Sequence, residues 1–589
     1  MKEQILKFFK GEVDDSEDTL LKYSHDASLL EVMPKLVVYP LDADDVRNLV
    51  KWMMVNKPNH PELSITARCA GTCMSGGAIG ESIIMDFTRH INKLIGGPLP
   101  TQNKDEWEIT VEPGMFYRDF EKITLAKGLI LPCYTASKSL NAMGGMYGNN
   151  SAGERTLKYG KTEDYIVSAK IIFHDGNEYT IKPLNQSELN QKMTLGGAEG
   201  EIYRRINKLI TENEEDIKHA KPKVHKNSAG YFIWNVINQN LKNIPALPAG
   251  GLRHDEYFSG SDLKYFDLNK LLVGSQGTLG IVTEITFKVI PDIKYSKLVA
   301  IFMNDISPLG RLVDEILELN PETLEAYDDK TMKLAVKFFP DFLKNKGILG
   351  MIKLGWSFIP EFFMMLSGGF PKLILLVEFS GQNEQEVNEK CKKLEEKIKD
   401  FKLKIHITEN EAEANKYWDI RRESFALLRK HVKKMHTAPF IDDIIVRPEF
   451  LPKFIPELNL ILSEYKLVYT IAGHAGDGNF HIIPLMDFKR PDTAKIILEL
   501  GERVYDLVLK YQGSITAEHN DGLIRTPYLE KMYGEKIIRI FREIKDIFDP
   551  QNIFNPGKKI ADKNSISGAG TREYIRDHIV KEHQSSHRV

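Results

Sequence analysis

Short apolar runs and helical patterns alternate through the first half of the chain. Runs such as PKLVVYP and SIIMDF have the length of strands, whereas ADDVRNLVKWMM carries apolar residues at helical spacing. The alternation predicts an α+β domain over residues 35–293. A helical lead-in is expected before it, over residues 1–34.

After about residue 294 the pattern changes. Charged helical stretches such as NEQEVNEKCKKLEEKIKDF are interleaved with apolar strands such as KLILLVEFS. A second α+β domain, which would act as a cap over the substrate, is therefore predicted over residues 294–525. The stretch EKIIRIFREIKDIF predicts a helix within residues 526–560, and a polar tail with few apolar anchors is expected over residues 561–589.

One segment stands apart within an apolar insertion at residues 337–371. Residues 347–366, GILGMIKLGWSFIPEFFMML, carry only Lys353 and Glu361 as charges. Pro360 and the central charges argue against a helix that crosses a membrane. Two interpretations stay open: a segment that docks on a membrane surface, and a segment buried in the second domain or against another copy in a homodimer.

Composition narrows the class of protein. Hydrophobic residues make up 42% of the chain and charged residues 27%, which argues against extended disorder. The net charge of −3 gives no basic surface for nucleic acid. Four cysteines without a CxxC pair, and an N-terminus without the apolar run of a signal peptide, indicate a cytoplasmic protein. If residues 347–366 dock on a membrane, we expect the inner face of the cytoplasmic membrane.

Three segments are unusually rich in glycine. They are residues 68–80, RCAGTCMSGGAIG, residues 132–153, which nearly lack bulky side chains, and residues 274–284, GSQGTLGIVTE. Glycines allow backbone N–H groups to approach and wrap an anionic pyrophosphate. A single such turn is equally typical of a structural bend, and neither the Rossmann nor the P-loop spacing is present.

Two glycine-bounded segments of the final third gather imidazoles and carboxylates. They read HAGDGNFH, from His474 to His481, and TAEHNDG, which contains Glu518 and His519. Residues seven apart in a regular strand face opposite sides, so the first two histidines converge only if GDG forms a turn. In an extended segment, Glu518 and His519 would face opposite sides. Imidazoles with a carboxylate suit Zn²⁺, or else Mn²⁺ or Fe²⁺.

The order of these motifs resembles a known family. Fragments YSHDA, ARCAGTCMSGG, AMGGMYGNNSAG, YGKTEDYIV, GSQGTLGIVTE, AGHAGDGNFH and FDPQNIFNPGK follow one another over residues 20–560. They resemble the FAD-dependent vanillyl-alcohol-oxidase and glycolate-oxidase family, in particular its D-lactate and glycolate dehydrogenase branch. The resemblance implies an α+β fold: a two-subdomain PCMH-type FAD-binding domain, a cap domain with an antiparallel sheet, and a C-terminal segment that returns to the flavin domain.

The resemblance also implies which residues hold FAD. The chain has Gln276 where the family commonly has Glu, and Asn149 and Asn150 where it has Thr or Ala. The first loop has no histidine, and Cys69 and Cys73 match no attachment pattern, so FAD is expected to bind without a covalent bond. The expected cofactor-binding residues are Gly71, Thr72, Ser75, Gly76, Gly77, Pro132, Gly144, Gly145, Asn149, Gly153, Gly277, Gly280 and Ile281.

In the same family the motifs HxGDGNxH and GEHG carry a metal and a base. By that resemblance His474, His481 and Glu518 bind a divalent metal, and His519 is the general base. GEHG appears here as AEHN, so the backbone geometry after His519 is expected to differ.

The implied reaction is the oxidation of a small D-2-hydroxy acid to the 2-oxo acid, with hydride transfer to the flavin N5 and electrons passed to a quinone or a carrier protein. The family pattern W-x-x-R points to Arg421 as the cation for the substrate carboxylate, with Arg422 as the alternative. Relatives that act on dicarboxylates have further polar or basic residues, whereas FALL and FIDD occur here. D-lactate is therefore favoured over D-2-hydroxyglutarate and glycolate.

Two other functions stay open. A non-redox ether-lipid synthase of the alkylglycerone-phosphate type shares the flavin cradle, but its chemistry needs no pair of metal-binding histidines. A flavin-binding subunit that serves only in assembly or electron transfer needs neither the metal residues nor His519.

Overall fold

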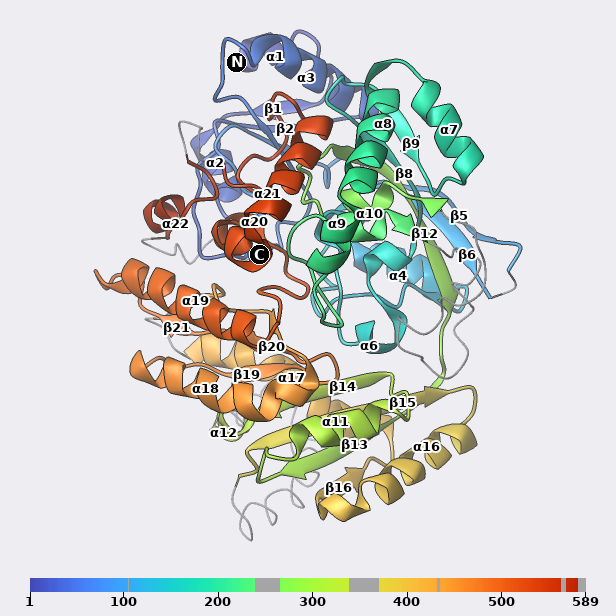
Figure 1. Cartoon of the computed structure of the whole chain (residues 1–589), viewed down its shortest axis with the longest axis vertical. Coiled ribbons are helices and arrows are strands. Elements are labelled where there is room, and N and C mark those ends of the chain that lie inside the picture. The colour runs from blue at the N-terminus through green and yellow to red at the C-terminus, as the bar shows by residue number, and fades with distance from the viewer. Residues whose placement is uncertain (104, 239–264, 338–369, 432–434, 563–567, 581–589) are drawn as a thin grey trace.

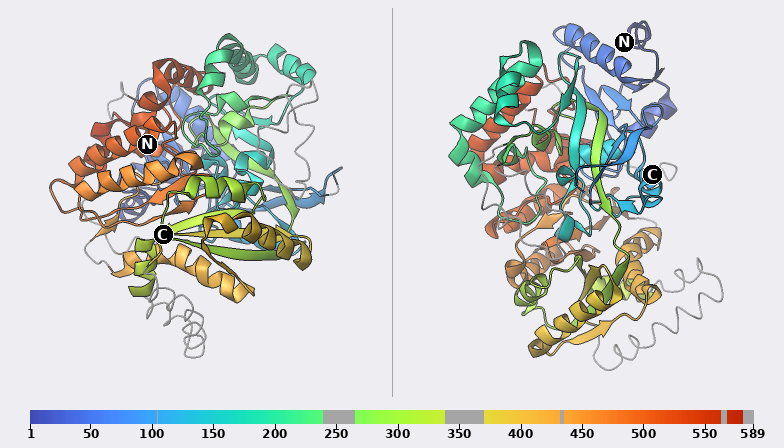
Figure 2. Two further views of the ribbon diagram at one scale, coloured as in Figure 1. Left: turned by 60° about the horizontal axis from the view of Figure 1, so that its bottom comes forward. Right: turned by 90° about the vertical axis from the view of Figure 1, so that its right-hand side faces the viewer.

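The computed structural model describes residues 1–103, 105–238, 265–337, 370–431, 435–562 and 568–580. The chain forms two lobes, an N-terminal domain above and a cap domain, which begins near residue 294, below (Figures 1 and 2). Within the described residues, the N-terminal domain has two larger sheets and the cap domain has one. This α+β architecture confirms the predicted fold class.

The first sheet of the N-terminal domain is mostly parallel. Its region contains α1 (Lys2–Ile5), β1 (Glu12–Asp14), α2 (Glu17–Tyr23), β2 (Leu36–Tyr39), α3 (Ala43–Asn56), β3 (Ile65–Arg68) and β4 (Ile83–Asp86). The strand order is β1-β2-β4-β3, and β2 and β4 are buried along their whole length, as is typical of parallel strands. Because β1 pairs with β2, the lead-in that was expected to be helical also contributes a strand.

The second sheet is antiparallel and lies beside two of the glycine-rich segments. Its region contains β5 (Leu94–Pro100), β6 (Trp107–Val111), α4 (Tyr117–Leu125), β7 (Leu129–Ile130), α5 (Met143–Asn149), α6 (Thr156–Tyr159), β8 (Ile166–Ile172), β9 (Glu178–Ile181), α7 (Gln186–Thr194), α8 (Gly197–Glu212), α9 (Glu214–Ala220), β10 (Ile237–Asn238), β11 (Tyr265–Phe266), α10 (Asn269–Leu272) and β12 (Ile281–Pro291). The central strand β12 pairs with β6, β7 and β8. Residues 274–280 lead directly into β12, and residues 132–153 contain α5.

The cap domain is built on a seven-stranded sheet. In order across the sheet, the strands are β16 (Lys404–Ile407), β13 (Tyr295–Met303), β15 (Leu373–Gly381), β14 (Thr323–Asp328), β19 (Ile471–His474), β20 (Asn479–Ile482) and β18 (Ile444–Ile445). All of these pairings are antiparallel, which confirms the expected sheet. Two short strands, β17 (His436–Thr437) and β21 (Leu485–Met486), pair separately.

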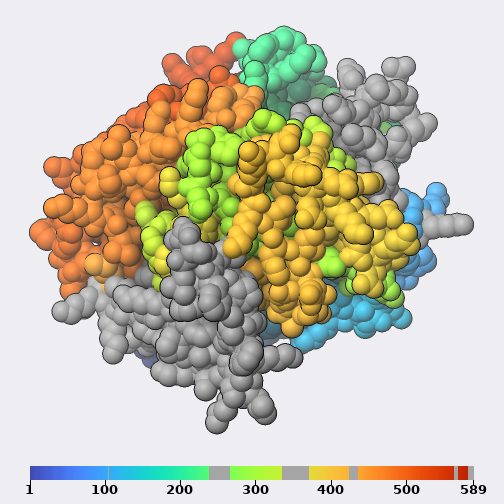
Figure 3. Space-filling model, turned by 90° about the horizontal axis from the view of Figure 1, so that it is seen from below, coloured from blue at the N-terminus to red at the C-terminus, as the bar shows by residue number. Residues whose placement is uncertain are grey.

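Helices cover both faces of the cap sheet. They are α11 (Leu309–Leu317), α12 (Asp329–Lys337), α16 (Glu384–Lys397), α17 (Glu411–His431), α18 (Leu451–Glu464) and α19 (Thr493–Lys510). Because side chains alternate along a strand, Val299 and Val377 join a core with α11, α16, α18 and α19, whereas Leu298, Ala300 and Leu376 join a core with α12 and α17. Seen from below, the cap forms much of the face of the molecule (Figure 3).

The chain returns to the N-terminal domain after the cap, as the resemblance implied. Helices α20 (Gly522–Arg525) and α21 (Leu529–Phe548) follow the last cap helix, with a break in α21 at Gly534. Helix α21 packs against α8, and Phe554 pairs with Ile65 of the first sheet. The C-terminal segment therefore completes the domain that the N-terminus begins.

The end of the chain differs from the expected polar tail. It contains helix α22 (Arg572–His578), in which Tyr574 and Ile575 are buried. The Val580 N–H donates to the Leu29 carbonyl at 3.1 Å. These few apolar residues are enough to anchor the segment because they lie close together and pack in the same core as Leu29. The local sequence pattern does not reveal that core.

The apolar segment 347–366 lies outside the described residues, as does most of the insertion at 337–371. Among the helices that are described, none is both long and apolar enough to span a bilayer.

Candidate active site

A cavity of about 1390 Å³ lies where the two domains meet. Glycine-rich segments of the N-terminal domain form part of its wall. The cap domain and the returning C-terminal segment supply the polar side chains predicted for catalysis and metal binding, which are Arg421, His474, His481, Glu518 and His519. Residues from distant parts of the sequence therefore share one cavity.

Most of the predicted FAD-binding residues line this cavity. They are Gly71, Thr72, Gly77, Gly144, Gly145, Asn149, Gly153, Gly277 and Gly280. Ser75, Gly76, Pro132 and Ile281 do not line it. The Ser75 carbonyl instead accepts the N–H of Leu523 at 2.9 Å, and the Ser75 hydroxyl donates to the His519 carbonyl at 3.2 Å. Ser75 thus ties the first glycine loop to the C-terminal segment.

The glycines of α5 shape the wall for a flat or extended ligand. A Cβ on Gly144 would lie 2.5 Å from the Pro113 Cβ, so this glycine allows the helix to pack closely. Gly145 is exposed at the cavity wall, and a Cβ there would have only the Cys69 Cβ within 4.0 Å. Side chains at such positions would fill the cavity, so the residues present fit FAD.

We predict that Gly145→Leu prevents FAD binding without harming the fold. Leucine favours a helix over glycine by roughly 0.5–1 kcal/mol, but its side chain would occupy the cavity. Purified variant protein should lose the flavin absorbance, with an FAD dissociation constant raised at least about tenfold. Gly196→Leu is the control, because Gly196 is exposed and a Cβ there would meet no other atom within 4 Å. Wild-type FAD content in Gly145→Leu would contradict the cradle.

The two histidines of HAGDGNFH converge through a tight hairpin, which meets the condition that their spacing set. Strands β19 and β20 pair antiparallel, with His474 opposite Asn479 and His481 opposite Ala472. The Asp477 N–H donates to the His474 carbonyl at 3.1 Å, and Gly478 adopts φ +76°. The imidazole centroids are consequently 5.3 Å apart.

His474, His481 and Glu518 offer donor atoms that lie within 4.8 Å of one another; His474 and Glu518 are buried and His481 is partly buried. His474 Nε2 lies 2.8 Å from Glu518 Oε1. The other ring nitrogen of each histidine contacts a carboxylate: His474 Nδ1 lies 2.5 Å from Glu325 Oε1, and His481 Nδ1 lies 3.1 Å from Asp442 Oδ1. Carboxylates commonly support metal-binding histidines in this way, so the residues fit a divalent ion.

Glu518 is kept ionised by its neighbours. The Lys226 ammonium, which is fully buried, lies 3.1 Å from Glu518 Oε1 and 2.8 Å from Asp477 Oδ2. Burial raises the pKa of Glu518, but Lys226 and His474 outweigh it and hold this pKa well below its usual value. The carboxylate is therefore available as a metal ligand.

Arg421 lies deeper in the site than Arg422. Its Nε lies 2.6 Å from Glu325 Oε2, and its side chain is 11% exposed. Glu325 therefore links the predicted substrate cation to the metal-ligand candidate His474. Arg422 instead forms an ion pair with Glu154 at 2.5 Å and is 43% exposed. Of the two arginines, Arg421 is therefore the one that lies beside the metal-ligand candidates.

The loop that carries His519 is not extended. Asp443 Oδ2 accepts the backbone N–H groups of Ala517, Glu518 and His519 at 2.7–2.9 Å, and the Thr516 hydroxyl at 2.6 Å. The loop therefore bends around one buried carboxylate oxygen of Asp443. Asn520, which replaces the usual glycine, adopts φ +68°, a conformation that asparagine tolerates.

His519 lines the cavity and contacts Asp442. Its Nδ1 lies 2.7 Å from Asp442 Oδ2. Burial lowers the pKa of His519, but the carboxylates of Asp442 and Asp443 outweigh burial and raise this pKa to about 9. The surroundings therefore favour the protonated, imidazolium form of His519.

Sequence reasoning missed the carboxylates and the lysine behind the site. Asp442 and Asp443 stand among apolar residues in FIDDIIV, and such a pattern signals buried charge. Glu325 and Lys226 carry no comparable local signal. They act as partners only because the fold buries them beside the site.

Two family models match the chain. The model described as FAD binding domain matches residues 34–182, and the model described as FAD linked oxidases, C-terminal domain matches residues 293–559.

Curated relatives are similar over most of the chain. A D-2-hydroxyglutarate dehydrogenase of Pseudomonas putida is 25% identical over 95% of this chain and 51% of its own length, so the chain spans about half of that relative. The glycolate oxidase subunit GlcD of Bacillus subtilis is 26% identical over 95% of this chain and 97% of its own length. A D-lactate dehydrogenase of Anaerostipes hadrus is 22% identical over 91% of this chain and 92% of its own length.

Solved structures share the fold. An alkyldihydroxyacetonephosphate synthase has a TM-score of 0.61 and 14% identity, covering 95% of this chain and 85% of its own. p-Cresol methylhydroxylase has a TM-score of 0.60 and 14% identity, covering 94% of each chain. The chain therefore combines an FAD binding domain with the C-terminal domain of FAD linked oxidases, and it is a flavoprotein.

Proposed function

We propose that the chain oxidises a small D-2-hydroxy acid to the 2-oxo acid with FAD, and that D-lactate is the favoured substrate. One observation carries the proposal: Arg421, His519 and the cluster of His474, His481 and Glu518 share a cavity with the glycine-lined cradle. Relatives named D-2-hydroxyglutarate dehydrogenase and D-lactate dehydrogenase support this reaction class.

Each side chain has a distinct task in this proposal. Arg421, oriented by Glu325, holds the substrate carboxylate. His519 removes the proton of the 2-hydroxyl, and Asp442 stabilises the resulting imidazolium. FAD, bound without a covalent bond, supplies the acceptor for the hydride from C2, and a divalent ion, with Zn²⁺ as the first candidate, supplies a Lewis acid for the hydroxyl.

D-2-hydroxyglutarate is the second candidate substrate. The preference for a monocarboxylate depended on the lack of a second cation near Arg421. In the structure, Arg422 and Lys489 also line the cavity, and Lys489 is exposed there. Either cation could bind a second carboxylate, so the proposal needs a test that compares substrates.

Anaerobic bleaching of the flavin tests the proposal. Oxidised protein mixed with D-lactate should lose its flavin absorbance. L-lactate should reduce the flavin at least about tenfold more slowly, because only one enantiomer places the hydrogen of C2 toward the flavin. D-2-hydroxyglutarate and glycolate are compared under the same conditions. If no 2-hydroxy acid bleaches the protein, the proposal is wrong. Re-oxidation with a quinone analogue then tests the proposed acceptor against a carrier protein.

A further inference from the structure

We infer that Asp442 is a positioning residue that orients His481 and His519 at the same time. The inference rests on the proposed function, in which His481 binds a metal and His519 accepts a proton. Asp442 is itself in neither role. Its contribution is to present the same ring nitrogen, Nε2, of both histidines to the site.

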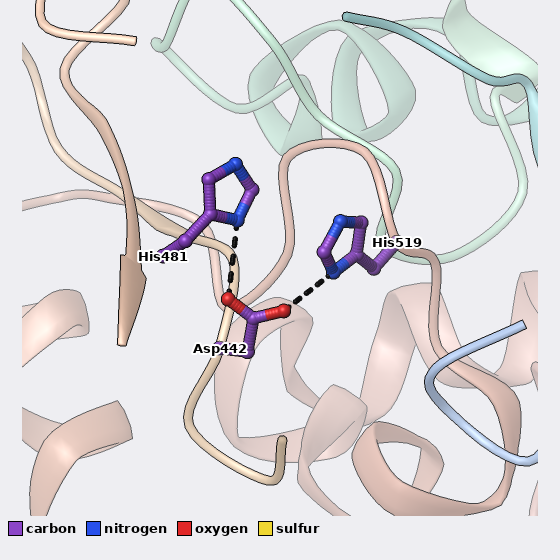
Figure 4. A group of neighbouring side chains, drawn as sticks. All are labelled: Asp442, His481 and His519. Atoms are coloured by element: carbon purple, nitrogen blue, oxygen red, sulfur yellow. Dashed lines mark hydrogen bonds and ion pairs between the residues drawn. The ribbon is translucent and has the colours of Figure 1, made fainter. Parts of the chain in front are cut away.

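The contacts of the Asp442 carboxylate support this role (Figure 4). Its two oxygens are divided between the two imidazoles: Oδ1 lies 3.1 Å from His481 Nδ1, and Oδ2 lies 2.7 Å from His519 Nδ1. The rings are nearly parallel, with centroids 5.0 Å apart and an interplanar angle of 22°. In Figure 4 both Nε2 atoms point away from Asp442.

This arrangement selects one tautomer for each ring. An ionised carboxylate has no proton to donate, so each Nδ1 that faces Asp442 must carry the proton. Each Nε2 then keeps its lone pair when the ring is neutral. That lone pair is what a metal ligand requires at His481 and what a base requires at His519. One fully buried side chain therefore prepares both functions.

The backbone of Asp442 is held by other residues, so its side chain can be changed selectively. The Asp442 carbonyl accepts from Arg525 Nη2 at 2.6 Å. The side chain of Asp443, not that of Asp442, binds the loop of His519. Two residues further on, β18 pairs with β20. Substitution of the Asp442 side chain leaves all of these contacts in place.

Asp442→Asn tests the inference, because an amide has one acceptor oxygen and its NH₂ group would face one of the two imidazoles. Competition between a chelator and the protein for Zn²⁺ alone measures metal affinity. We expect the Zn²⁺ dissociation constant to rise about 10–100-fold. At saturating Zn²⁺ and D-lactate, we expect the rate of flavin reduction to fall about 10²–10⁴-fold, with little change in KM.

Two further variants separate positioning from folding. Asp442→Glu keeps both acceptor oxygens and should recover part of the metal affinity and part of the reduction rate. Asp267→Asn is the control, because Asp267 is a buried carboxylate outside the site that accepts from Asn269 N–H at 2.9 Å. It should leave both quantities at the wild-type value.

The outcomes distinguish this inference from the proposed function. If the wild-type protein is active and Asp442→Asn has the same reduction rate and the same Zn²⁺ affinity, only the role of Asp442 is overturned. A loss of metal affinity without a loss of rate, or the reverse, overturns the dual role. A wild-type protein that neither retains Zn²⁺ nor is bleached by a 2-hydroxy acid overturns both proposals.

Discussion

Replacement of His519 by asparagine is expected to slow flavin reduction by about 10²–10⁴-fold, the usual contribution of a positioned general base. Asparagine retains a group that can hydrogen-bond to Asp442 but cannot accept the hydroxyl proton. Since Asp443 holds the loop through backbone N–H groups, the loop should persist. Stopped-flow absorbance with the proposed substrate measures the rate, and the flavin spectrum reports FAD content.

His174→Asn is the matched control for this change. His174 Nδ1 contacts the Phe548 carbonyl at 2.9 Å, and His174 does not line the cavity. It should reduce its flavin at the wild-type rate. If His519→Asn retains more than about a tenth of the wild-type rate, another group removes the proton and the assignment of His519 is wrong.

Replacement of Lys226 by methionine is expected to lower the free energy of unfolding by about 3–5 kcal/mol. Lys226 is fully buried between Asp477 and Glu518. Burial lowers its pKa, but these two carboxylates outweigh burial and raise the pKa above its ordinary value. Without the ammonium, two negative charges stay buried with less compensation. Thermal denaturation of metal-free protein should show a clear fall in Tm.

Lys170→Met provides the control for the loss of a lysine charge. Lys170 Nζ lies 2.9 Å from Glu284 Oε2, but the lysine side chain is 40% exposed. A pair of this kind contributes roughly 0–1 kcal/mol, because water screens it and its side chains lose entropy. If both variants shift Tm equally, the buried ion pairs of Lys226 contribute no more to the free energy of unfolding than the exposed pair of Lys170, and our assignment is wrong.

The cradle shows how far a local pattern reaches. Glycine density singled out the three segments, and nine of the thirteen positions that the family resemblance implied line the cavity. The pattern did not separate glycines that face the ligand from residues that join segments together. Ser75 belongs to the second kind, because its partners are Leu523 and His519. No spacing rule relates positions so far apart.

The sequence by itself determined the α+β class, the three glycine-rich segments, and the clustering of imidazoles and carboxylates in two glycine-bounded segments, while the family resemblance assigned His474, His481 and Glu518 to a metal and His519 to the base. These features depend on spacings of a few residues, because the geometry of strands and turns fixes the side on which each side chain lies. Only the tertiary structure decided which charges compensate those residues. Lys226 meets Glu518 across 292 positions, and Asp442 meets His519 across 77. Such pairs form because a buried charge without a partner costs free energy. Which residue becomes the partner depends on which distant strands and loops the fold brings together.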